Sequence, residues 1–155
     1  MNTSGRRNIV VTGGTDGIGK EIARRLARAG HRLILVGRDC DKGARAMQEI
    51  LETTDNGGVR FIQKDLSLVS EADCLAEEVT RHFPALHYLV HSAGAVRGWR
   101  ELTSEGVESN FAINFLGRFA LTCRLLPTLR AAGQPGQAAR ILLIGGAARN
   151  GKIHF

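Results

Sequence analysis

The stretch Asn8-Ile9-Val10-Val11-Thr12-Gly13-Gly14-Thr15-Asp16-Gly17-Ile18-Gly19 decides the fold of this chain. An apolar run of strand length stops at a glycine-rich turn, and apolar side chains then recur at helical spacing through residues 20–29. The stretch predicts a strand, a loop of bare backbone and the start of a helix. We assign the apolar face of that helix to Ile18, Ile22, Leu26 and Ala29.

The loop between this strand and helix suits a diphosphate. Glycines allow positive φ and let backbone N–H groups come close to a ligand. The start of a helix adds unpaired N–H groups and the positive end of the helix dipole. The alternative is a tight turn in which the glycines serve only to reverse the chain.

Size and composition limit the class of protein. A chain of 155 residues with 43% hydrophobic residues is long enough for one globular domain, and we expect a single domain over residues 1–155. The mean hydropathy of −0.09 is too low for a membrane protein, and no apolar run approaches the roughly 20 residues that span a bilayer. Residues 1–7 lack the apolar segment of a signal peptide, so we expect a cytoplasmic protein.

Charge and cysteine content exclude further roles. The formal net charge is +6, but the arginines are scattered and no aromatic platform accompanies them, so we expect no nucleic-acid partner. The same charge attracts an anionic cofactor. Cys40, Cys74 and Cys123 lie far apart without metal-ligand spacing, so we expect neither a disulfide nor a metal site and interpret them as reduced packing residues.

Short apolar runs alternate with helical patterns along the whole chain. After the first strand, further strands are predicted at 31–36, 59–64, 85–90 and 140–144, and helices at 40–54, 70–83 and about 102–129. This alternation predicts an α/β fold: a Rossmann-like doubly wound parallel sheet in the order 3-2-1-4-5, with helices on both faces. A dinucleotide would lie across the carboxyl ends of the first and fourth strands.

Three details of the later helices are also predicted. The second helix has its apolar positions at Ala44, Met47 and Leu51, and residues 70–73 are close to a capping box. The longest helix is apolar on more than one side, so we expect it to be buried by more than its own sheet. Its two stripes are Phe111, Phe115 and Phe119, and Ile113, Leu116, Ala120 and Cys123.

The glycine spacing resembles that of a known family. Gly13, Gly17 and Gly19 stand as Thr-Gly-x-x-x-Gly-x-Gly, which is similar to the short-chain dehydrogenase/reductase family of nicotinamide-dependent oxidoreductases. Further matches follow in order: Asp65-Leu66 after the third strand, Ser92-Ala93-Gly94 after the fourth, and Asn114-x-x-Gly117 in the longest helix. The sequence of residues 101–129 is most similar to that of retinol-dehydrogenase-like members.

This resemblance implies a set of site residues. The catalytic position is Asn114, and the cofactor-binding positions are Gly13, Thr15, Asp16, Gly17, Ile18, Gly19, Arg38, Asp65, Leu66, Ser92, Ala93 and Gly94. In the family, the residue carried onto Asp65 contacts the adenine ring, and the one carried onto Asn114 kinks the helix and holds a water that relays protons to a lysine. Asp65 could instead end its strand and satisfy a loop N–H. Ser92 stands where relatives have a bracing asparagine, which implies a weaker or water-mediated brace.

The end of the second strand indicates which dinucleotide is preferred. A Rossmann unit usually carries an acidic residue there for the ribose 2′-hydroxyl, but position 37 is glycine and Arg38 follows. An arginine favours a 2′-phosphate by charge and by forked hydrogen bonding, so NADP(H) is preferred and NAD(H) remains possible. The alternative is a solvated Arg38, with Asp39 capping the next helix. We interpret His91 as a packed or hydrogen-bonded residue rather than an acid–base group.

Some of the family's catalytic groups have no counterpart in this sequence. Relatives carry two serines after the fifth strand, where this chain has Gly145-Gly146, and continue to a Tyr-x-x-x-Lys helix. Tyr88 is the only tyrosine, and Ser92 rather than lysine stands four residues after it. We therefore expect the resemblance to cover the amino-terminal part of the family domain, truncated after the fifth strand.

Three interpretations remain open. In the first, the chain is the NAD(P)(H)-binding portion of an oxidoreductase that moves hydride between NADP(H) and an alcohol or carbonyl substrate, and is inactive by itself. In the second, it is a nucleotide-binding sensor or interaction module that has lost catalysis. In the third, it is a remnant that folds poorly. A truncated sheet would leave residues 141–144 as an unpaired apolar edge, so we also expect self-association.

Overall fold

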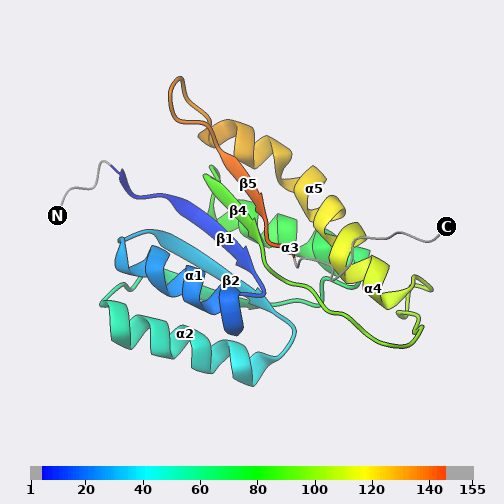
Figure 1. Ribbon diagram of the computed structural model, residues 1–155. Coiled ribbons are helices and arrows are strands. Elements are labelled where there is room, and N and C mark those ends of the chain that lie inside the picture. Colours follow the sequence, from blue (N-terminus) through cyan, green and yellow to red (C-terminus); the bar gives the residue numbers. More distant parts are fainter. Residues whose placement is uncertain (1–4, 146–155) are drawn as a thin grey trace.

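A single parallel sheet organises the computed structural model, which describes residues 5–145 (Figure 1). The elements are β1 (Asn8–Thr12), α1 (Gly17–Arg28), β2 (Arg32–Gly37), α2 (Cys40–Thr54), β3 (Val59–Gln63), α3 (Val69–His82), β4 (Tyr88–His91), α4 (Ser109–Phe111), the π-helical segment η2 (Ala112–Leu116), α5 (Gly117–Ala132) and β5 (Arg140–Leu143). The strand order is β3-β2-β1-β4-β5, with every pair parallel. This is the Rossmann-like α/β sheet predicted from the sequence.

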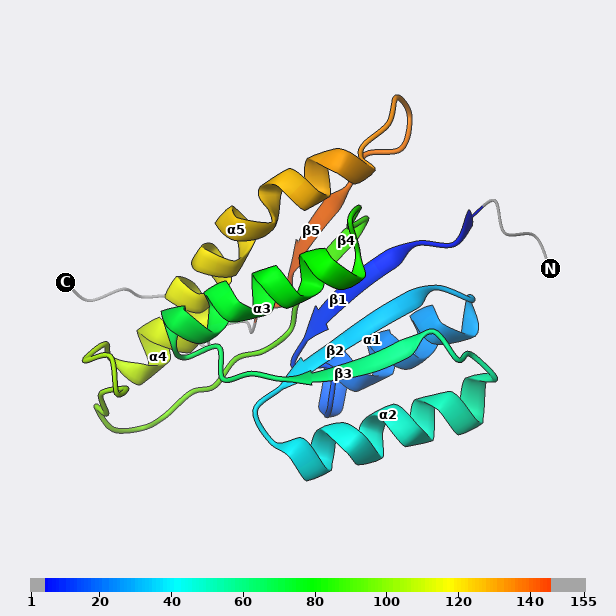
Figure 2. The ribbon, with the colours of Figure 1, turned by 180° about the vertical axis from the view of Figure 1, so that it is seen from behind.

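Helices cover both faces of this sheet. α1 and α2 lie on one face, and α3 and the long α4-η2-α5 helix lie on the other (Figure 1 and Figure 2). Side chains alternate along β1, so that Ile9 and Val11 pack with α1 and α2 while Val10 packs with α3 and α5. These two cores fix the strands and align their carboxyl ends along one edge of the fold.

The buried faces of α1 and α2 differ from the predicted ones. α1 buries Gly19, Ala23 and Ala27, whereas Ile18 is 65% exposed. α2 buries its inner positions 43, 46 and 50 and leaves Ala44 exposed. Small residues on the inner face let a helix approach the sheet closely, and the larger apolar residues at positions 22, 26, 47 and 51 pack beside that contact.

The start of α3 is capped by a distant loop, so the predicted capping box at residues 70–73 is wrong. Leu68 precedes the helix and makes no side-chain cap. Instead, the Glu105 carboxylate accepts hydrogen bonds from the backbone N–H groups of Val69 (2.7 Å) and Ser70 (3.0 Å) and from the Ser70 hydroxyl (2.7 Å). α3 buries Ala72, Leu75, Ala76 and Val79.

The long helix begins at Ser109 rather than near residue 102. The Glu108 carboxylate caps it by accepting hydrogen bonds from the N–H groups two and three residues on. The phenylalanine stripe lies on its outer side: Phe111, Phe115 and Phe119 are 50%, 57% and 59% exposed and stack on one another. All three cysteines are also free and exposed, so the packing role predicted for them is wrong.

β5 forms one edge of the sheet within the described residues. It pairs with β4 on one side, and Ile141, Leu142 and Leu143 are 41%, 42% and 66% exposed. Over residues 5–145, none of the helices combines the length and the hydropathy needed to cross a bilayer.

Candidate functional site

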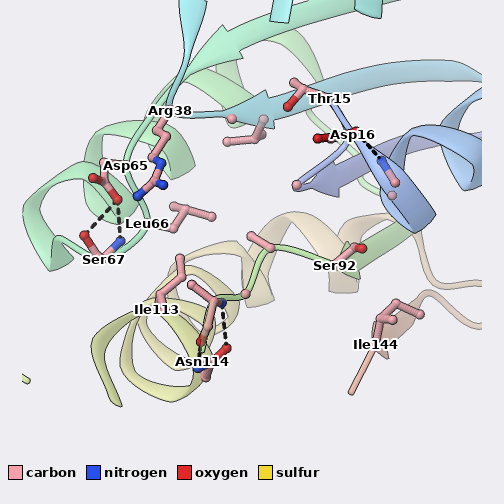
Figure 3. Close-up of a pocket in the computed structure, with 18 of the residues that line it drawn as sticks. Thr15, Asp16, Arg38, Asp65, Leu66, Ser67, Ser92, Ile113, Asn114 and Ile144 are labelled. Carbon is pink, nitrogen blue, oxygen red and sulfur yellow. Dashed lines mark hydrogen bonds between the residues drawn. The ribbon is translucent and has the colours of Figure 1, made fainter. Parts of the chain in front are cut away.

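A cleft of about 1180 Å³ lies at the carboxyl ends of the strands (Figure 3). Its lining includes all thirteen residues proposed from the sequence: Gly13, Thr15, Asp16, Gly17, Ile18, Gly19, Arg38, Asp65, Leu66, Ser92, Ala93, Gly94 and Asn114. Seven further lining residues with polar side chains were not among those proposed, namely Asp39, Lys42, Lys64, Ser67, Arg97, Ser109 and Arg118. The fold thus gathers into one cleft segments that are more than a hundred residues apart, and the binding role of each residue stays a prediction.

The glycine loop is built by close approaches of the backbone. Gly13 has a φ of +66°, and its N–H donates to the Val36 carbonyl (2.8 Å), which ties the loop to β2. A Cβ on Gly19 would lie 2.2 Å from the Gly13 carbonyl oxygen. Gly17 has a φ of +49° and lines the cleft, and a Cβ there would meet no atom within 4 Å. The start of α1, with N–H groups that the helix itself cannot pair, is therefore open to a ligand.

Asp16 and Lys42 form an ion pair in the cleft. The Asp16 Oδ1 accepts from the Gly17 N–H (2.8 Å) and caps α1, while its Oδ2 lies 2.7 Å from the Lys42 Nζ. The hydrogen bond from Lys42, followed by that from Gly17, holds the pKa of Asp16 below its usual value. Lys42 thus neutralises a carboxylate that would otherwise repel an anion. The pair forms because α2 packs beside the loop, so the sequence alone did not predict it.

Gly37 and Arg38 connect the end of β2 to the cleft. A Cβ on Gly37 would lie 2.9 Å from the Thr15 side chain, so packing against the glycine loop already requires a glycine there. The Arg38 side chain lies on the same side of the cleft as Asp65 and Leu66 (Figure 3).

Asp39 caps α2 at the same strand end. Its carboxylate accepts a hydrogen bond from the Lys42 N–H (2.9 Å). The sequence offered this capping role as part of the alternative interpretation of the strand end. Helix capping by Asp39 and an Arg38 in the cleft therefore occur together.

Asp65 stabilises its own loop. Its Oδ1 accepts from the backbone N–H (2.9 Å) and the hydroxyl (2.8 Å) of Ser67, which is the loop role that the sequence left open. A Cβ on Gly117 would lie 2.0 Å from the Leu66 carbonyl oxygen, so the long helix packs directly on this loop.

The chain after β4 is fixed against β1 and the glycine loop. The Ser92 N–H donates to the Thr12 carbonyl (3.1 Å), and the Ala93 N–H donates to the Thr12 hydroxyl (3.2 Å). The Ser92 hydroxyl oxygen would lie 3.0 Å from a Cβ on Gly19, which places it against the start of α1. Gly94 approaches Asn114 so closely that its Cβ would lie 2.9 Å from the amide oxygen.

His91 is the last residue of β4 and is fully buried. Its Nε2 lies 2.9 Å from the Thr122 hydroxyl, and its Nδ1 has no hydrogen-bond partner among the described residues. Burial, with a smaller contribution from the nearby Arg118, lowers the pKa of His91 to about 4. The ring is therefore neutral at pH 7, in agreement with its interpretation as a packed, hydrogen-bonded histidine.

Asn114 lies in η2, a π-helical segment that interrupts the long helix where the resemblance implied a kink. Its Nδ2 donates to the Ala95 carbonyl (2.6 Å), and its Oδ1 accepts from the Ala95 N–H (3.3 Å). The polar amide in an apolar helix is thus satisfied by the backbone of the cleft wall.

Arg118 lines the cleft and joins the segments that follow two strands. Its Nη2 donates to the Ala93 carbonyl (2.6 Å) after β4, and its Nη1 donates to the Ile144 carbonyl (3.3 Å) after β5. Burial lowers the pKa of Arg118. Arg118 is the only charged residue between Glu108 and Arg124, and this was the sequence signal for its role.

The family's catalytic serine and tyrosine have no equivalent among the described residues that line the cleft. Gly146, which stands where relatives have the catalytic serine, lies outside the described residues. Tyr88 pairs with Ile9 and Arg140 in the sheet and does not line the cleft. Residues 5–145 contain no group of three or more His, Cys, Asp or Glu side chains that could hold a metal ion.

Comparison with known proteins gives a consistent result. Residues 7–153 match the family described as short chain dehydrogenase. The chain is 36% identical over 141 residues to human polyprenol dehydrogenase, covering 91% of this chain and 43% of that protein. It is 37% identical over 148 residues to mouse retinol dehydrogenase 12, covering 95% of this chain and 46% of that protein. The chain therefore spans less than half the length of these curated relatives.

A solved structure shares the fold as well. The Pseudomonas aeruginosa RhlG/NADP active-site complex superimposes with a TM-score of 0.79 at 31% sequence identity, covering 90% of this chain and 54% of that one.

Proposed function

Because this chain belongs to the short-chain dehydrogenase family, we propose that its cleft binds a nicotinamide adenine dinucleotide, with NADP(H) preferred and NAD(H) possible. One observation carries the proposal: residues from the glycine loop, from the ends of β2, β3 and β4 and from η2 line a single cleft. The RhlG structure, with its bound NADP, shows that a related chain of this fold accommodates such a molecule.

The lining residues divide the proposed ligand into parts. The diphosphate would lie against residues 13–19 and the start of α1, where backbone N–H groups are open to an anion. Arg38, Asp65 and Leu66 would surround the adenosine. The resemblance puts the reacting end beside Asn114, so the nicotinamide would lie against Asn114 and the neighbouring Gly94.

The preference for NADP(H) rests on charge. No carboxylate occupies position 37, and the carboxylate of Asp16 is neutralised by Lys42. Arg38 lines the cleft and forms no ion pair among the described residues, so its guanidinium is available to a ligand. A 2′-phosphate gains a charge-assisted contact there that a 2′-hydroxyl does not.

The reaction that we propose for the protein is hydride transfer between NADP(H) and an alcohol or carbonyl substrate. When bound, the nicotinamide supplies or accepts the hydride. The residues of this chain would bind and orient the dinucleotide, and Asn114 would hold a water at the reacting end. The 155 residues contain no Tyr-x-x-x-Lys, and Gly146 has no hydroxyl, so we expect no turnover by this chain alone.

Calorimetry tests the cofactor assignment. NADPH should bind more tightly than NADH, and Arg38→Ala should remove most of that difference, about 1–3 kcal/mol for a charge-assisted contact. Arg45→Ala, which removes an exposed arginine from the side of α2 outside the cleft, serves as the matched control. Equal affinities for NADPH and NADH would contradict the preference, and absence of binding would contradict the function.

The alternative is a nucleotide-binding sensor or interaction module. The sequence feature in its favour is Gly146, which stands where the resemblance places the catalytic serine and has no hydroxyl to hydrogen-bond a substrate. Sequencing the reading frame beyond Phe155 separates the two, because a Tyr-x-x-x-Lys downstream supports the oxidoreductase. An NADPH-consumption assay on a panel of small carbonyls then tests whether the 155-residue chain itself turns over.

We also propose that this chain self-associates through the exposed edge of β5. Three consecutive apolar residues leave their backbone on one side unpaired within the described sheet, and such edges recruit further strands. Light scattering over a concentration series should show association, and Leu143→Lys should reduce it, because a charge on an edge strand opposes pairing. A monomer at every concentration would contradict this proposal.

A further inference from the structure

Two asparagines of the long helix hold the chain after β4 in the same way. The Asn114 amide exchanges two hydrogen bonds with the backbone of Ala95, at 2.6 and 3.3 Å. The Asn110 amide does the same with Arg97: its Oδ1 accepts from the Arg97 N–H (2.7 Å), and its Nδ2 donates to the Arg97 carbonyl (3.1 Å). Both amides thus act as the peptide groups of a neighbouring strand would.

The spacing of these contacts follows from elementary geometry. Four residues rise about 6 Å along an ideal helix, and two residues span about 6.6 Å of extended chain. Asparagines at i and i+4 can therefore pair with alternate residues of a segment that runs antiparallel to the helix. Residues 95 and 97 are half-buried, whereas Val96 between them is 95% exposed and makes no backbone hydrogen bond among the described residues.

The paired segment forms part of the cleft wall. Ala95, Val96 and Arg97 line the cleft, as does Asn114, whereas Asn110 is not among the lining residues. Arg97 is fixed further by an ion pair with Glu101, whose carbonyl accepts from the Ser109 N–H (2.8 Å). Asn110 therefore contacts the wall without reaching the space that a ligand would occupy.

We propose that Asn110 is a positioning residue that acts with Asn114 as a two-rung clamp on residues 95–97 and thereby sets the cleft wall at the nicotinamide end. Asparagine suits this role because its amide carries one donor and one acceptor side by side, matching the backbone of one residue. An aspartate of the same shape sets an acceptor against the Arg97 carbonyl, and an alanine offers neither group. The consequence for binding rests on the proposed dinucleotide function, whereas the clamp itself does not.

Amide hydrogen exchange measured by NMR tests the clamp directly. The Ala95 and Arg97 N–H groups should exchange more slowly than that of Val96, in an alternating pattern. Asn110→Ala should accelerate exchange at Arg97 by about tenfold or more and leave Ala95 less affected, because Asn114 remains. Asn110→Asp, the isosteric variant, keeps an acceptor for the Arg97 N–H and loses only the donor to the Arg97 carbonyl, so it should accelerate exchange less than Asn110→Ala does. Gln48→Ala on α2 should not accelerate it. Unchanged exchange at Arg97 in both Asn110 variants would overturn the proposal.

A pair of ligands tests the effect on the cleft. NADP⁺ has the nicotinamide half, and adenosine 2′,5′-bisphosphate lacks it, so a change confined to the nicotinamide end should weaken only the first. We expect Asn110→Ala to weaken NADP⁺ binding about fivefold and to leave the bisphosphate unchanged, whereas Arg38→Ala should weaken both. Equal losses for both ligands would show that Asn110 only supports the fold and overturn the positioning role. If the wild-type chain binds neither ligand, the proposed function fails, and the exchange data still decide the clamp.

Discussion

The two ends of the cleft are built by different means. At the phosphate end, one continuous stretch supplies the strand end, the loop and the helix start, and glycines bring backbone against backbone. At the opposite end, Asn110, Asn114 and Arg118 of the long helix hold the backbone that follows β4 and β5. The first end depends on the absence of side chains, and the second depends on polar side chains that reach across elements.

The largest effect is expected at Gly19. Alanine there places a Cβ 2.2 Å from the Gly13 carbonyl oxygen, and both atoms belong to the tightly packed loop and helix. We expect Gly19→Ala to lower the free energy of unfolding by about 3 kcal/mol or more, because the backbone must shift. Chemical denaturation measures the loss. A variant as stable as the wild type would show that the phosphate end tolerates side chains.

Gly17→Ala is the matched control at the same end. A Cβ there enters open space in the cleft, so the stability cost is that of the positive φ alone, about 1 kcal/mol. The same Cβ obstructs the approach of the diphosphate to the backbone, and Gly17→Val obstructs it more. Calorimetry should therefore show weaker binding of NADPH and NADH alike, and a loss restricted to one of them would contradict the assignment.

The next largest effect concerns His91 at the opposite end. The pKa of His91 is about 4 in the folded chain, against an ordinary 6.5, so the unfolded chain binds more protons between these values. Protonation of His91 therefore does not affect the free energy of unfolding above about pH 6.5. As the pH falls from 6.5 towards 4, it lowers the free energy of unfolding by at most about 3 kcal/mol.

His91→Asn provides the comparison, because asparagine is polar and does not titrate between pH 4 and 7. Denaturation midpoints of the wild type and the variant should be measured between pH 4 and 7. His31 and His87, whose pKa values are also lowered by burial, remain in both proteins and cancel in the difference. Parallel pH profiles for the two proteins would show that His91 already titrates normally in the folded chain.

The difference between the two cleft ends also explains how far the sequence could be interpreted. The glycine loop, the strand order and the cap at Asp39 were predicted because each depends on neighbouring residues or on a regular period. The faces of α1 and α2 were misplaced, since close packing selected small residues such as Ala23 and Ala46 over larger apolar ones.

Contacts between distant segments left no local pattern. Lys42 reaches Asp16 across 26 residues, and Glu105 reaches Ser70 across 35. Asn110 and Arg118 stand in a helix that the sequence did predict, yet their partners are backbone groups whose positions only the fold determines. The opposite end of the cleft was therefore predicted by resemblance at Asn114 and missed at its neighbours.

A smaller effect is expected for Lys42 at the adenosine end. Lys42→Met leaves the Asp16 carboxylate unpaired in the cleft, so it should weaken NADPH binding several-fold more than NADH binding by repelling the 2′-phosphate. Asp16→Asn should change the preference for NADPH over NADH in the opposite direction, and the double variant should restore most of the wild-type preference. Calorimetry on the four proteins completes the cycle, and additive effects would show that the two side chains act independently.

The smallest effect is expected at Glu105, which connects the loop at the nicotinamide end to α3. Glu105→Gln removes the charge from the start of the helix, and its amide can accept at one oxygen only. The Tm at pH 7 should therefore fall by a few degrees, on the order expected for a weakened cap.

The hydrogen bonds from Ser70, with that from Val69, hold the pKa of Glu105 below 4.5. The advantage of glutamate is therefore complete above about pH 4.5 and disappears as the pH falls below it. Glu77→Gln, on the exposed side of α3, should leave the Tm unchanged. A Tm difference between wild type and Glu105→Gln that persists undiminished at pH 3 would mean that shape rather than charge makes the cap.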